Sequence, residues 1–399
     1  MPGRQKQDTV DSAAEASIRP ALAFPEVTSV GDPRLRAAGA AAAPGVPPDT
    51  VVVSADGHWL EGDLWIDRFP VELRDKAPRM VFEDGGWQII VNGQRPPFPA
   101  EARMLCQAFE CREGMSSVGE RLADLDAEGI AKELLFPQRL FGLYVAGDVD
   151  MREWVFGCYN RYIAEICARA PGRLYFCAIP NYWDPAAAAD SLREVKALGA
   201  RAVMVPIQPR KGIDGEPIIW TSPKMAPFWR AVEESGLPLC FHIGENLPVH
   251  LPGSMPAFVL NQMAGFRPTW GALTYGGLFD RHPDLRIVFL EGGISWVASA
   301  IHDADMLYHS FRSQVDVTLR HDPSWYWYNH CYATFITDPA GLDLLHRIGA
   351  DRVLWSADYP HFESSLGYSR ASVASVFEAA TEADARRIVG GNAIDLFCL

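Results

Sequence analysis

Short apolar runs rich in β-branched and aromatic residues recur from residue 51 onward, and stretches with helical spacing separate most of them. This alternation is typical of parallel β/α units. Eight strands are expected, at residues 51–55, 131–136, 174–179, 202–205, 238–243, 286–290, 331–336 and 352–356. Eight strands with intervening helices predict an α/β fold, namely a (β/α)8 TIM barrel.

The helical stretches fall where such a barrel needs them. They are expected at residues 117–128, 151–170, 185–198, 222–235, 295–313 and 369–380. An insertion at about residues 62–116 interrupts the alternation after the first strand. Within it, residues 87–94 alternate and contain Asn92-Gly93, a pair that favours a β-hairpin turn. Long connections at the carboxyl face of a barrel usually shape the pocket, and a second one follows His242.

The first 48 residues differ from the rest. They are rich in Ala, Pro, Ser and Gly, and they lack an amphipathic period that could bury one face. Residues 1–48 are therefore predicted to be a disordered N-terminal arm, and residues 49–399 to form the barrel domain.

Composition narrows the function. With 399 residues, 48% of them hydrophobic, the chain can bury a large core. Its 36 basic and 50 acidic residues give a formal charge of −14, which opposes binding to nucleic acid or to anionic lipid and favours a small-molecule substrate. The eight cysteines form no CxxC pair, and neither a membrane-length apolar run nor a signal-peptide pattern is present. We expect a soluble cytoplasmic protein.

Carboxylate and imidazole side chains follow several of the predicted strands. Asp56, His58, His242, Glu291 and Asp358 all fall at carboxyl ends of strands, which converge on one mouth of a TIM barrel. Asp56 and His58 are two residues apart, so they point to the same side of an extended strand. Imidazole and carboxylate suit zinc, iron or manganese, and a cation would offset the crowded charges. These residues predict a metalloenzyme.

The motifs together resemble a known family. They are Ser54-Ala55-Asp56-Gly57-His58 with Asp63-Leu64-Trp65, Tyr159-Asn160-Arg161-Tyr162, Phe241-His242, Glu291-Gly292-Gly293, Asp358-Tyr359-Pro360-His361 and Gly391-Asn392-Ala393. The chain resembles the amidohydrolase-related branch of the amidohydrolase superfamily, which includes the aminocarboxymuconate-semialdehyde decarboxylase-like enzymes. The resemblance implies that Asp56 and His58 are first-strand ligands and His242 the fifth-strand ligand. It makes Asp358 the eighth-strand ligand and the proton-handling carboxylate.

Glu291 departs from that pattern, because the well-studied decarboxylases have a histidine near the metal on the sixth strand. Glu291 could be a catalytic acid or base, a bridge to a second metal, or a group that orients His242 or His58. His361 or Glu245 could supply further ligands, although packing in the last loop is an alternative for His361. One or two ions per chain are therefore open.

Three reactions remain open. The leading expectation is hydrolysis by a metal-activated water, with Asp358 accepting its proton. The alternatives are nonoxidative decarboxylation of an aromatic or unsaturated acid and oxygenation at a dinuclear iron centre; a binding protein without activity ranks last. Aromatic residues in the loops expected around the mouth suit a bulky, largely apolar ligand with a carboxyl or carrier group. They are Trp59, Trp65, Phe141, Tyr144, Tyr182, Trp183, Phe258, Trp270, Trp296 and Phe362. The aromatic segment at residues 325–328 leaves a homo-oligomer possible.

Overall fold

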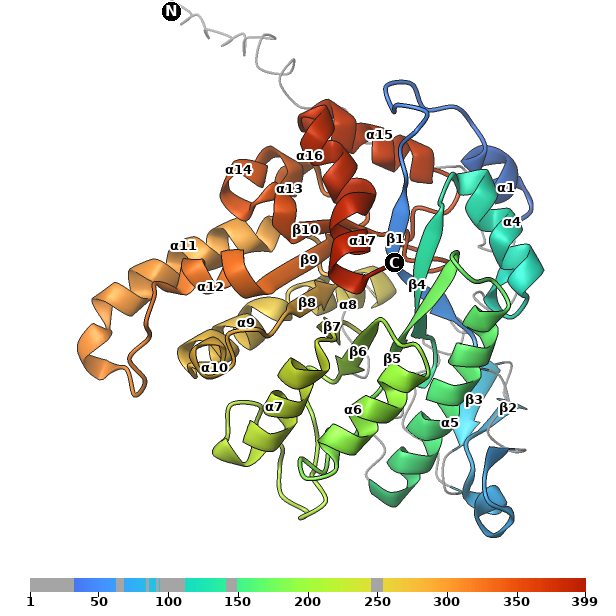
Figure 1. Cartoon of the computed structure of the whole chain (residues 1–399). Helices are drawn as coiled ribbons and strands as arrows, with labels where there is room; N and C mark the ends of the chain where they lie inside the picture. The colour runs from blue at the N-terminus through green and yellow to red at the C-terminus, as the bar shows by residue number, and fades with distance from the viewer. Residues whose placement is uncertain are drawn as a thin grey trace, which may run out of the picture.

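A single eight-stranded sheet forms the centre of the molecule (Figure 1). The computed structural model describes residues 32–61, 68–83, 86–90, 93, 112–140, 149–244 and 254–399. The strands of the sheet are β1 (Val53–Trp59), β4 (Lys132–Pro137), β5 (Leu174–Ala178), β6 (Ala202–Val205), β7 (Leu239–His242), β8 (Ile287–Leu290), β9 (Cys331–Phe335) and β10 (Val353–Trp355). They lie side by side in chain order and pair in parallel, which confirms the predicted (β/α)8 TIM barrel.

The last strand returns to the first and closes the barrel. The backbone N–H of His58 donates to the carbonyl of Tyr359 at 2.7 Å, and the N–H of Asp358 donates to the carbonyl of Asp56 at 3.1 Å. Closure therefore brings the first and eighth candidate segments into direct contact.

Most strand ends lie within one residue of the prediction, but β1 differs. It continues to Trp59, four residues beyond the expected end, so Asp56 and His58 lie within the strand. The pairing with β4 shifts by one residue between Ser54 and Gly57, which is a β-bulge. The strand end was predicted too early because the polar residues Asp56 and His58 interrupt the apolar run that marks the strand.

Helices surround the strands, as the circular arrangement in Figure 1 shows. Between β1 and β7 these are η2 (Val71–Lys76), η3 (Glu113–Met115), α4 (Val118–Glu128), α5 (Val149–Ala168), α6 (Ala188–Ala197), η5 (Pro223–Met225) and α7 (Ala226–Ser235). After β7 they are α8 (Ser254–Met263), α9 (Phe266–Tyr275), α10 (Leu278–Arg281), α11 (Ser295–Ser310), η6 (Arg312–Gln314), α12 (Pro323–His330), α13 (Pro339–Asp343), α14 (Leu345–Ile348), η7 (Ala350–Arg352), α15 (Ser369–Ala379), α16 (Glu382–Arg386), η8 (Arg387–Gly391) and α17 (Asn392–Phe397).

Local sequence explains where these helices start and stop. In α4, the Ser117 hydroxyl accepts a hydrogen bond from the N–H of Glu120, and Gly129 ends the helix with a φ of 78°. The six helices expected from the sequence are confirmed, with ends within four residues of the prediction.

The inserted hairpin exists, but its turn is not the expected one. Strand β3 (Gly86–Ile90) pairs with the preceding strand β2 (Arg79–Glu83), so the connection lies at residues 84–85, outside the described residues. The described hairpin therefore connects through residues 84–85 and not through Asn92-Gly93; of that pair only Gly93 is described, in a turn with a φ of 71°. The alternation at residues 87–90 belongs to a strand, as expected, and its partner precedes it in the chain.

Part of the expected N-terminal arm is ordered. Residues 1–31 lie outside the described residues, whereas residues 32–48 contain α1 (Arg34–Gly39). Leu35 is buried, and the Arg36 guanidinium donates to the Asp124 carboxylate at 2.8 Å. The expectation of disorder is thus wrong for this last part of the arm, because Leu35 packs with Met115, Tyr359 and Leu366, and Arg36 pairs with Glu120 and Asp124 of α4.

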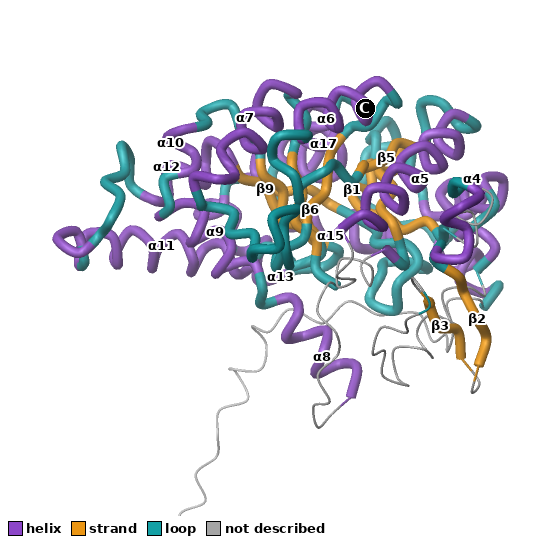
Figure 2. Tube along the Cα trace, turned by 90° about the horizontal axis from the view of Figure 1, so that it is seen from below, coloured by secondary structure: helices purple, strands orange, loops and turns teal. Residues whose placement is uncertain are grey.

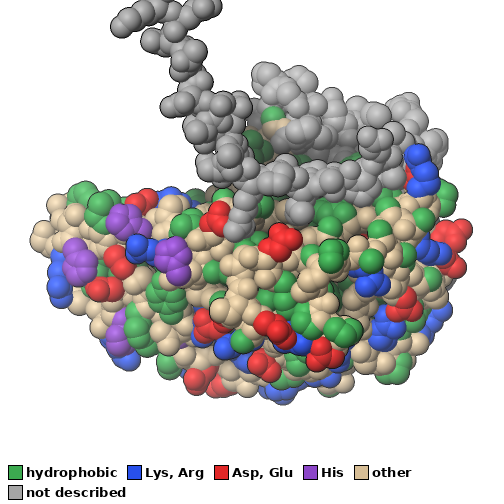
Figure 3. All heavy atoms as spheres, turned by 90° about the horizontal axis from the view of Figure 1, so that it is seen from above, with side chains coloured by type: hydrophobic (Ala, Val, Ile, Leu, Met, Phe, Trp, Pro, Cys, Tyr) green, Lys and Arg blue, Asp and Glu red, His purple; other side chains and the backbone are tan. Residues whose placement is uncertain are grey.

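The inserted hairpin and α8 project from the same side of the barrel (Figure 2). They belong to the connections after β1 and β7, so this is the side to which the carboxyl ends of the strands point. On the face seen in Figure 3, acidic and basic side chains are interspersed rather than gathered by sign. None of the helices in the described part of the chain has the length and apolar content needed to cross a bilayer.

Candidate metal centre

The first strand places two fully buried polar side chains in the barrel. Asp56 and His58 are both inaccessible to solvent. The Nδ1–H of His58 donates to the Pro137 carbonyl at 2.8 Å, since a carbonyl oxygen can only accept. In neutral His58 the lone pair therefore lies on Nε2, which faces Asp358 Oδ1 at 3.1 Å and Asp56 Oδ1 at 3.8 Å. This is the tautomer that a metal ligand needs.

His242 repeats this arrangement at the end of β7. Its Nδ1–H donates to the carbonyl of Ile243 at 2.7 Å, and its Nε2 lies 3.1 Å from Asp56 Oδ2. The two imidazole rings, with centroids 5.1 Å apart, thus present Nε2 atoms to the same carboxylate, that of Asp56. The fifth-strand ligand predicted from the family resemblance lies where it can join those of the first strand.

Glu291 and Asp358, which follow strands β8 and β10, have an unusual backbone conformation. Glu291 has a φ of 69° and Asp358 a φ of 53°, values that are uncommon outside glycine. The N–H of Glu291 donates to the Thr334 hydroxyl at 2.8 Å, which holds the turn after β8. Both carboxylates consequently point inward, and both side chains are buried.

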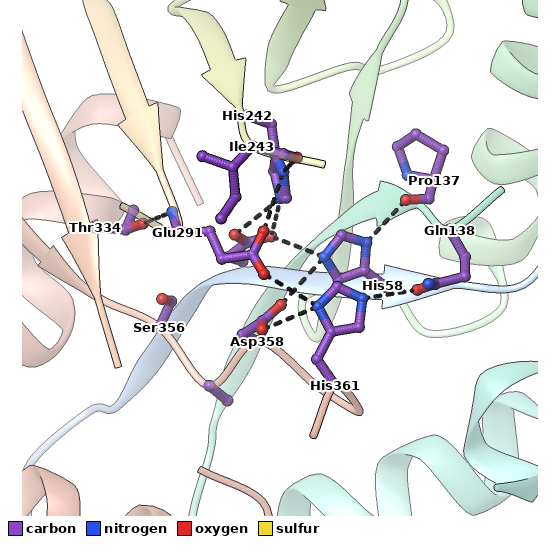
Figure 4. Close-up of polar contacts among 12 residues, drawn as sticks. His58, Pro137, Gln138, His242, Ile243, Glu291, Thr334, Ser356, Asp358 and His361 are labelled. Atoms are coloured by element: carbon purple, nitrogen blue, oxygen red, sulfur yellow. Dashed lines mark hydrogen bonds and ion pairs between the residues drawn. The ribbon is translucent and has the colours of Figure 1, made fainter. Parts of the chain in front are cut away.

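His361 completes the cluster (Figure 4). Its Nδ1 lies 3.0 Å from Asp358 Oδ2 and 3.2 Å from Glu291 Oε1, and its Nε2 lies 3.1 Å from Gln138 Oε1. The His361 ring stacks on the His58 ring with centroids 4.0 Å apart. The last loop therefore contributes to the centre rather than packing elsewhere.

The electrostatics of this cluster call for a cation. Burial opposes protonation of His242, but Asp56 and Glu291 outweigh it and raise its pKa to about 10. Burial and the nearby Asp358 raise the pKa of Glu291 to about 7. Burial also raises the pKa of Asp358 and lowers that of His58. The carboxylates are stable here only if protons or a metal ion balance them.

Two buried carboxylate oxygens are further evidence for a cation site. Asp56 Oδ2 and Asp358 Oδ1 are buried and receive no hydrogen bond from any described residue, although an imidazole nitrogen lies 3.1 Å from each. Buried acceptors without donors are costly. Buried carboxylate oxygens and imidazole nitrogens that converge in this way are the atoms that a bound cation requires, so the residues fit a divalent metal ion.

The structure brings together all six residues that the sequence singled out. They form two overlapping sets whose ligand atoms lie within 4.8 Å of one another: Asp56, His58, His242 and Glu291, and His58, Glu291, Asp358 and His361. Glu291 touches both His242 and His361, so ligation and orientation of His242 both stay open for it. The further candidate Glu245 lies outside the described residues.

Sequence reasoning missed the groups that support these six. Gln138 follows β4 and carries no charge, so no motif marked it, yet its side chain contacts His361. Glu61, two residues after β1, is buried, and its carboxylate accepts hydrogen bonds from the backbone N–H groups of Gln138, Arg139 and Leu140. Its pKa is raised to about 7 by burial, against those donors.

A buried ion pair lies behind the first strand. Arg121 on α4 pairs with Glu133 on β4 at 2.7 Å, and neither side chain is exposed. Arg121 also donates to the carbonyl of His58 at 2.9 Å and stacks on the Tyr359 ring. The Arg121 guanidinium thus contacts both the first strand, which carries Asp56 and His58, and the loop after the last strand, which carries Asp358 and His361.

The aromatic residues expected around the mouth divide into two groups. Trp59, Tyr182, Trp183 and Trp270 are buried in the core, so they pack the barrel. Phe362, next to His361, is 51% exposed and remains a candidate for contact with a ligand. Trp65, Phe141 and Tyr144 lie outside the described residues, as does the side chain of Phe258.

Comparisons with known proteins identify related sequences. The sequence profile of the family described as Amidohydrolase matches residues 74–399. A gamma-resorcylate decarboxylase of Rhodococcus jostii (strain RHA1) is 31% identical over 277 residues, which cover 60% of this chain and 75% of that protein. A gamma-resorcylate decarboxylase of Rhizobium radiobacter is 29% identical over 265 residues, with the same coverage.

Solved structures share the fold. An amidohydrolase from Mycobacterium avium subsp. paratuberculosis K-10 superposes with a TM-score of 0.73 at 21% identity, covering 88% of this chain and 100% of that one. A dihydroxybenzoic acid decarboxylase from Polaromonas sp. JS666, solved with bound manganese and the inhibitor 2-nitroresorcinol, gives a TM-score of 0.61 at 20% identity, covering 88% and 97%.

Proposed function

The chain belongs to the amidohydrolase family, and we propose that it catalyses the metal-dependent, nonoxidative decarboxylation of an aromatic carboxylic acid. The observation that carries this proposal is the buried cluster of Asp56, His58, His242 and Asp358, in which Asp56 contacts His242 and His58 contacts Asp358 at 3.1 Å each, in a chain whose relatives are decarboxylases. Hydrolysis, the leading expectation from the sequence, has less support, because the relatives favour the alternative. Decarboxylation stays the better supported reaction despite the presence of Glu291, because these relatives match the chain over most of their length.

Asp56, His58, His242 and Asp358 would hold the ion. A divalent cation bound there would attract the oxygen donors of an acidic substrate and stabilise negative charge that develops on it. The Pro137 and Ile243 carbonyls fix the ring orientations of His58 and His242, so the ligands are arranged before the substrate arrives. The complete burial of these groups keeps water from competing with the substrate.

Asp358 is placed to handle the proton. In the reaction, the bond between the ring carbon and the carboxylate breaks, its electron pair stays on the ring, and carbon dioxide leaves. A proton then replaces the carboxylate on the same carbon. His361 Nδ1 lies 3.0 Å from Asp358 Oδ2, so the two side chains could exchange the proton between them.

The relatives suggest which substrates to try. Gamma-resorcylate decarboxylases and a 2,6-dihydroxybenzoate decarboxylase are among them, so hydroxylated benzoic acids form the first class. The purified protein, loaded with Mn²⁺ under anaerobic conditions, would be incubated with 2,6-dihydroxybenzoate and with 5-carboxyvanillate. We expect carbon dioxide and the corresponding phenol in equal amounts, with no oxygen consumed.

The matched control is Asp358→Asn, which keeps the shape of the side chain and removes its proton chemistry. Equal rates for the variant and the wild type would contradict the role of Asp358. Hydrolysis would be favoured over decarboxylation if the protein cleaved an ester or amide analogue with incorporation of solvent oxygen and released no carbon dioxide from any acid tested.

A further inference from the structure

We propose that this centre holds two divalent ions, the second bound by His361, Glu291 and Asp358, with the Asp358 carboxylate bridging the pair. The inference uses the metal centre of the proposed function but not its reaction. It assigns a ligand role to Glu291, which belongs to both sets of potential ligands, and to His361, which belongs to a different set from Asp56 and His242.

The spread of the donor atoms is the first argument. Four ligand atoms in each of the two sets lie within 4.8 Å of one another, but the six side chains do not form one such set. Opposite ligands of a six-coordinate ion at about 2.1–2.2 Å are separated by less than that. One ion therefore cannot reach all six residues, whereas two neighbouring ions can.

The orientation of the Asp358 carboxylate is the second argument. Its Oδ1 faces His58 Nε2 at 3.1 Å, and its Oδ2 faces His361 Nδ1 at 3.0 Å. The two oxygens thus address different imidazoles, as in a carboxylate that bridges two ions about 3.5–4 Å apart. Asp358 Oδ1 is also fully buried and receives no hydrogen bond from any described residue.

The support of His361 is the third argument. The Nε2–H of His361 donates a hydrogen bond to Gln138 Oε1. The other ring nitrogen, Nδ1, therefore faces Asp358 and Glu291. His58 is held in the same way by the carbonyl of the preceding residue, Pro137. Two adjacent residues thereby fix two stacked rings, each with its other nitrogen directed at a carboxylate (Figure 4). Such anchoring is typical of histidines that ligate metals.

Charge agrees with this arrangement. The six residues include three carboxylates, those of Asp56, Glu291 and Asp358, so one divalent ion leaves an excess negative charge in a buried site. A second divalent ion next to Glu291 and Asp358 would offset it. Without that ion, a proton on His361 would occupy the same place between the two carboxylates, and the experiment below separates these states.

The test counts ions directly. The full-length protein is stripped with a chelator, reloaded with Mn²⁺ and separated from free metal, and its manganese content is measured by mass spectrometry. Electron paramagnetic resonance then reports whether the bound ions are exchange-coupled. We expect two manganese ions per chain with a coupled spectrum for the wild type, and one uncoupled ion for His361→Leu.

Two further variants make the result decisive. His309→Leu removes an exposed histidine that pairs with Asp322 on the outer surface, and it should leave the count at two. Gln138→Leu keeps every ligand but removes the acceptor that orients His361, and it should weaken the second ion by about 10–100-fold and leave the first in place. This variant remains informative if His361→Leu fails to fold.

One ion per chain in the wild type at saturating Mn²⁺ would overturn the proposal, as would an unchanged count in both His361→Leu and Gln138→Leu. The outcome is separate from that of the proposed function. Carbon dioxide release with one ion would retain the decarboxylase and reject the second site, whereas two coupled ions without carbon dioxide release would do the reverse.

Discussion

Replacing Arg121 by methionine should destabilise the fold through its buried partner. The Arg121 guanidinium donates to Glu133 at 2.7 Å and to the carbonyl of His58 at 2.9 Å, and it stacks on the Tyr359 ring. Neither Arg121 nor Glu133 is exposed. Methionine fills most of the space but supplies no positive charge, so Glu133 would stay in the interior without a partner.

The expected cost is about 3–5 kcal/mol, the range found when one member of a buried ion pair is removed. Most of it comes from the desolvated carboxylate rather than from lost packing, because methionine keeps much of the apolar contact. The double variant Arg121→Met/Glu133→Leu removes both charges. It should regain all but about 1–2 kcal/mol of the wild-type free energy of unfolding, since two apolar groups replace the pair.

The cost should also depend on pH. Burial already raises the pKa of Glu133 above its ordinary value of 4.5, against the effect of Arg121. Loss of Arg121 would raise this pKa further, so the folded variant binds a proton more tightly than its unfolded chain. Between the folded-state pKa of Glu133 in the wild type and its higher folded-state pKa in the variant, the stability of the variant relative to the wild type should therefore improve as pH falls, by up to about 1.4 kcal/mol per unit.

Equilibrium urea unfolding, followed by tryptophan fluorescence in the presence of a chelator, measures these quantities at about pH 8 and about pH 5.5. A cost under about 1 kcal/mol for Arg121→Met at the higher pH would refute the argument that Glu133 depends on this guanidinium. A cost that grew as the pH fell would refute the assignment of the penalty to an ionised Glu133. A double variant less stable than the single one would show that packing, not charge, dominates.

Three further outcomes follow from the centre. Asp358→Asn should lower the rate of carbon dioxide release by about 10²–10⁴-fold, as expected for loss of a proton donor, and manganese analysis should still find bound metal. Thr334→Val removes the hydroxyl that accepts the N–H of Glu291 and should cost about 1–3 kcal/mol in urea unfolding, whereas Thr334→Ser, which keeps the hydroxyl, should cost less. Removal of metal by a chelator should lower the thermal unfolding temperature. Readdition of Mn²⁺ to about 100 times its dissociation constant should restore about 2.7 kcal/mol of the free energy of unfolding. An unchanged unfolding temperature would argue against an ion bound to the native state.

The sequence predicted the barrel well because buried parallel strands produce a local signal. Strand β6 matched the prediction at both ends, since its residues are apolar and fully buried. β1 did not match, because Asp56 and His58 are polar residues inside the strand. The hairpin shows the same limit: its alternation was visible, but the choice of partner depends on pairing that a sequence pattern does not contain.

The six candidate ligands could be predicted because a TIM barrel brings the carboxyl ends of its strands together whatever their separation in sequence. Their supporting groups could not. Gln138 acts through an amide, Pro137 through a backbone carbonyl, and Arg121 through contacts that span three elements. Such groups are defined by distance in space, and their residue types are common in many other roles.

The backbone at Glu291 and Asp358 has a consequence for protein engineering. At φ values of 69° and 53°, the presence of a β-carbon costs roughly 1–2 kcal/mol that glycine does not pay, somewhat less for aspartate. A library selected only for heat resistance would therefore tend to accumulate glycine at these two positions. The fittest clones by that criterion would have lost two carboxylates from the centre, so any thermostabilisation of this chain should hold both codons fixed.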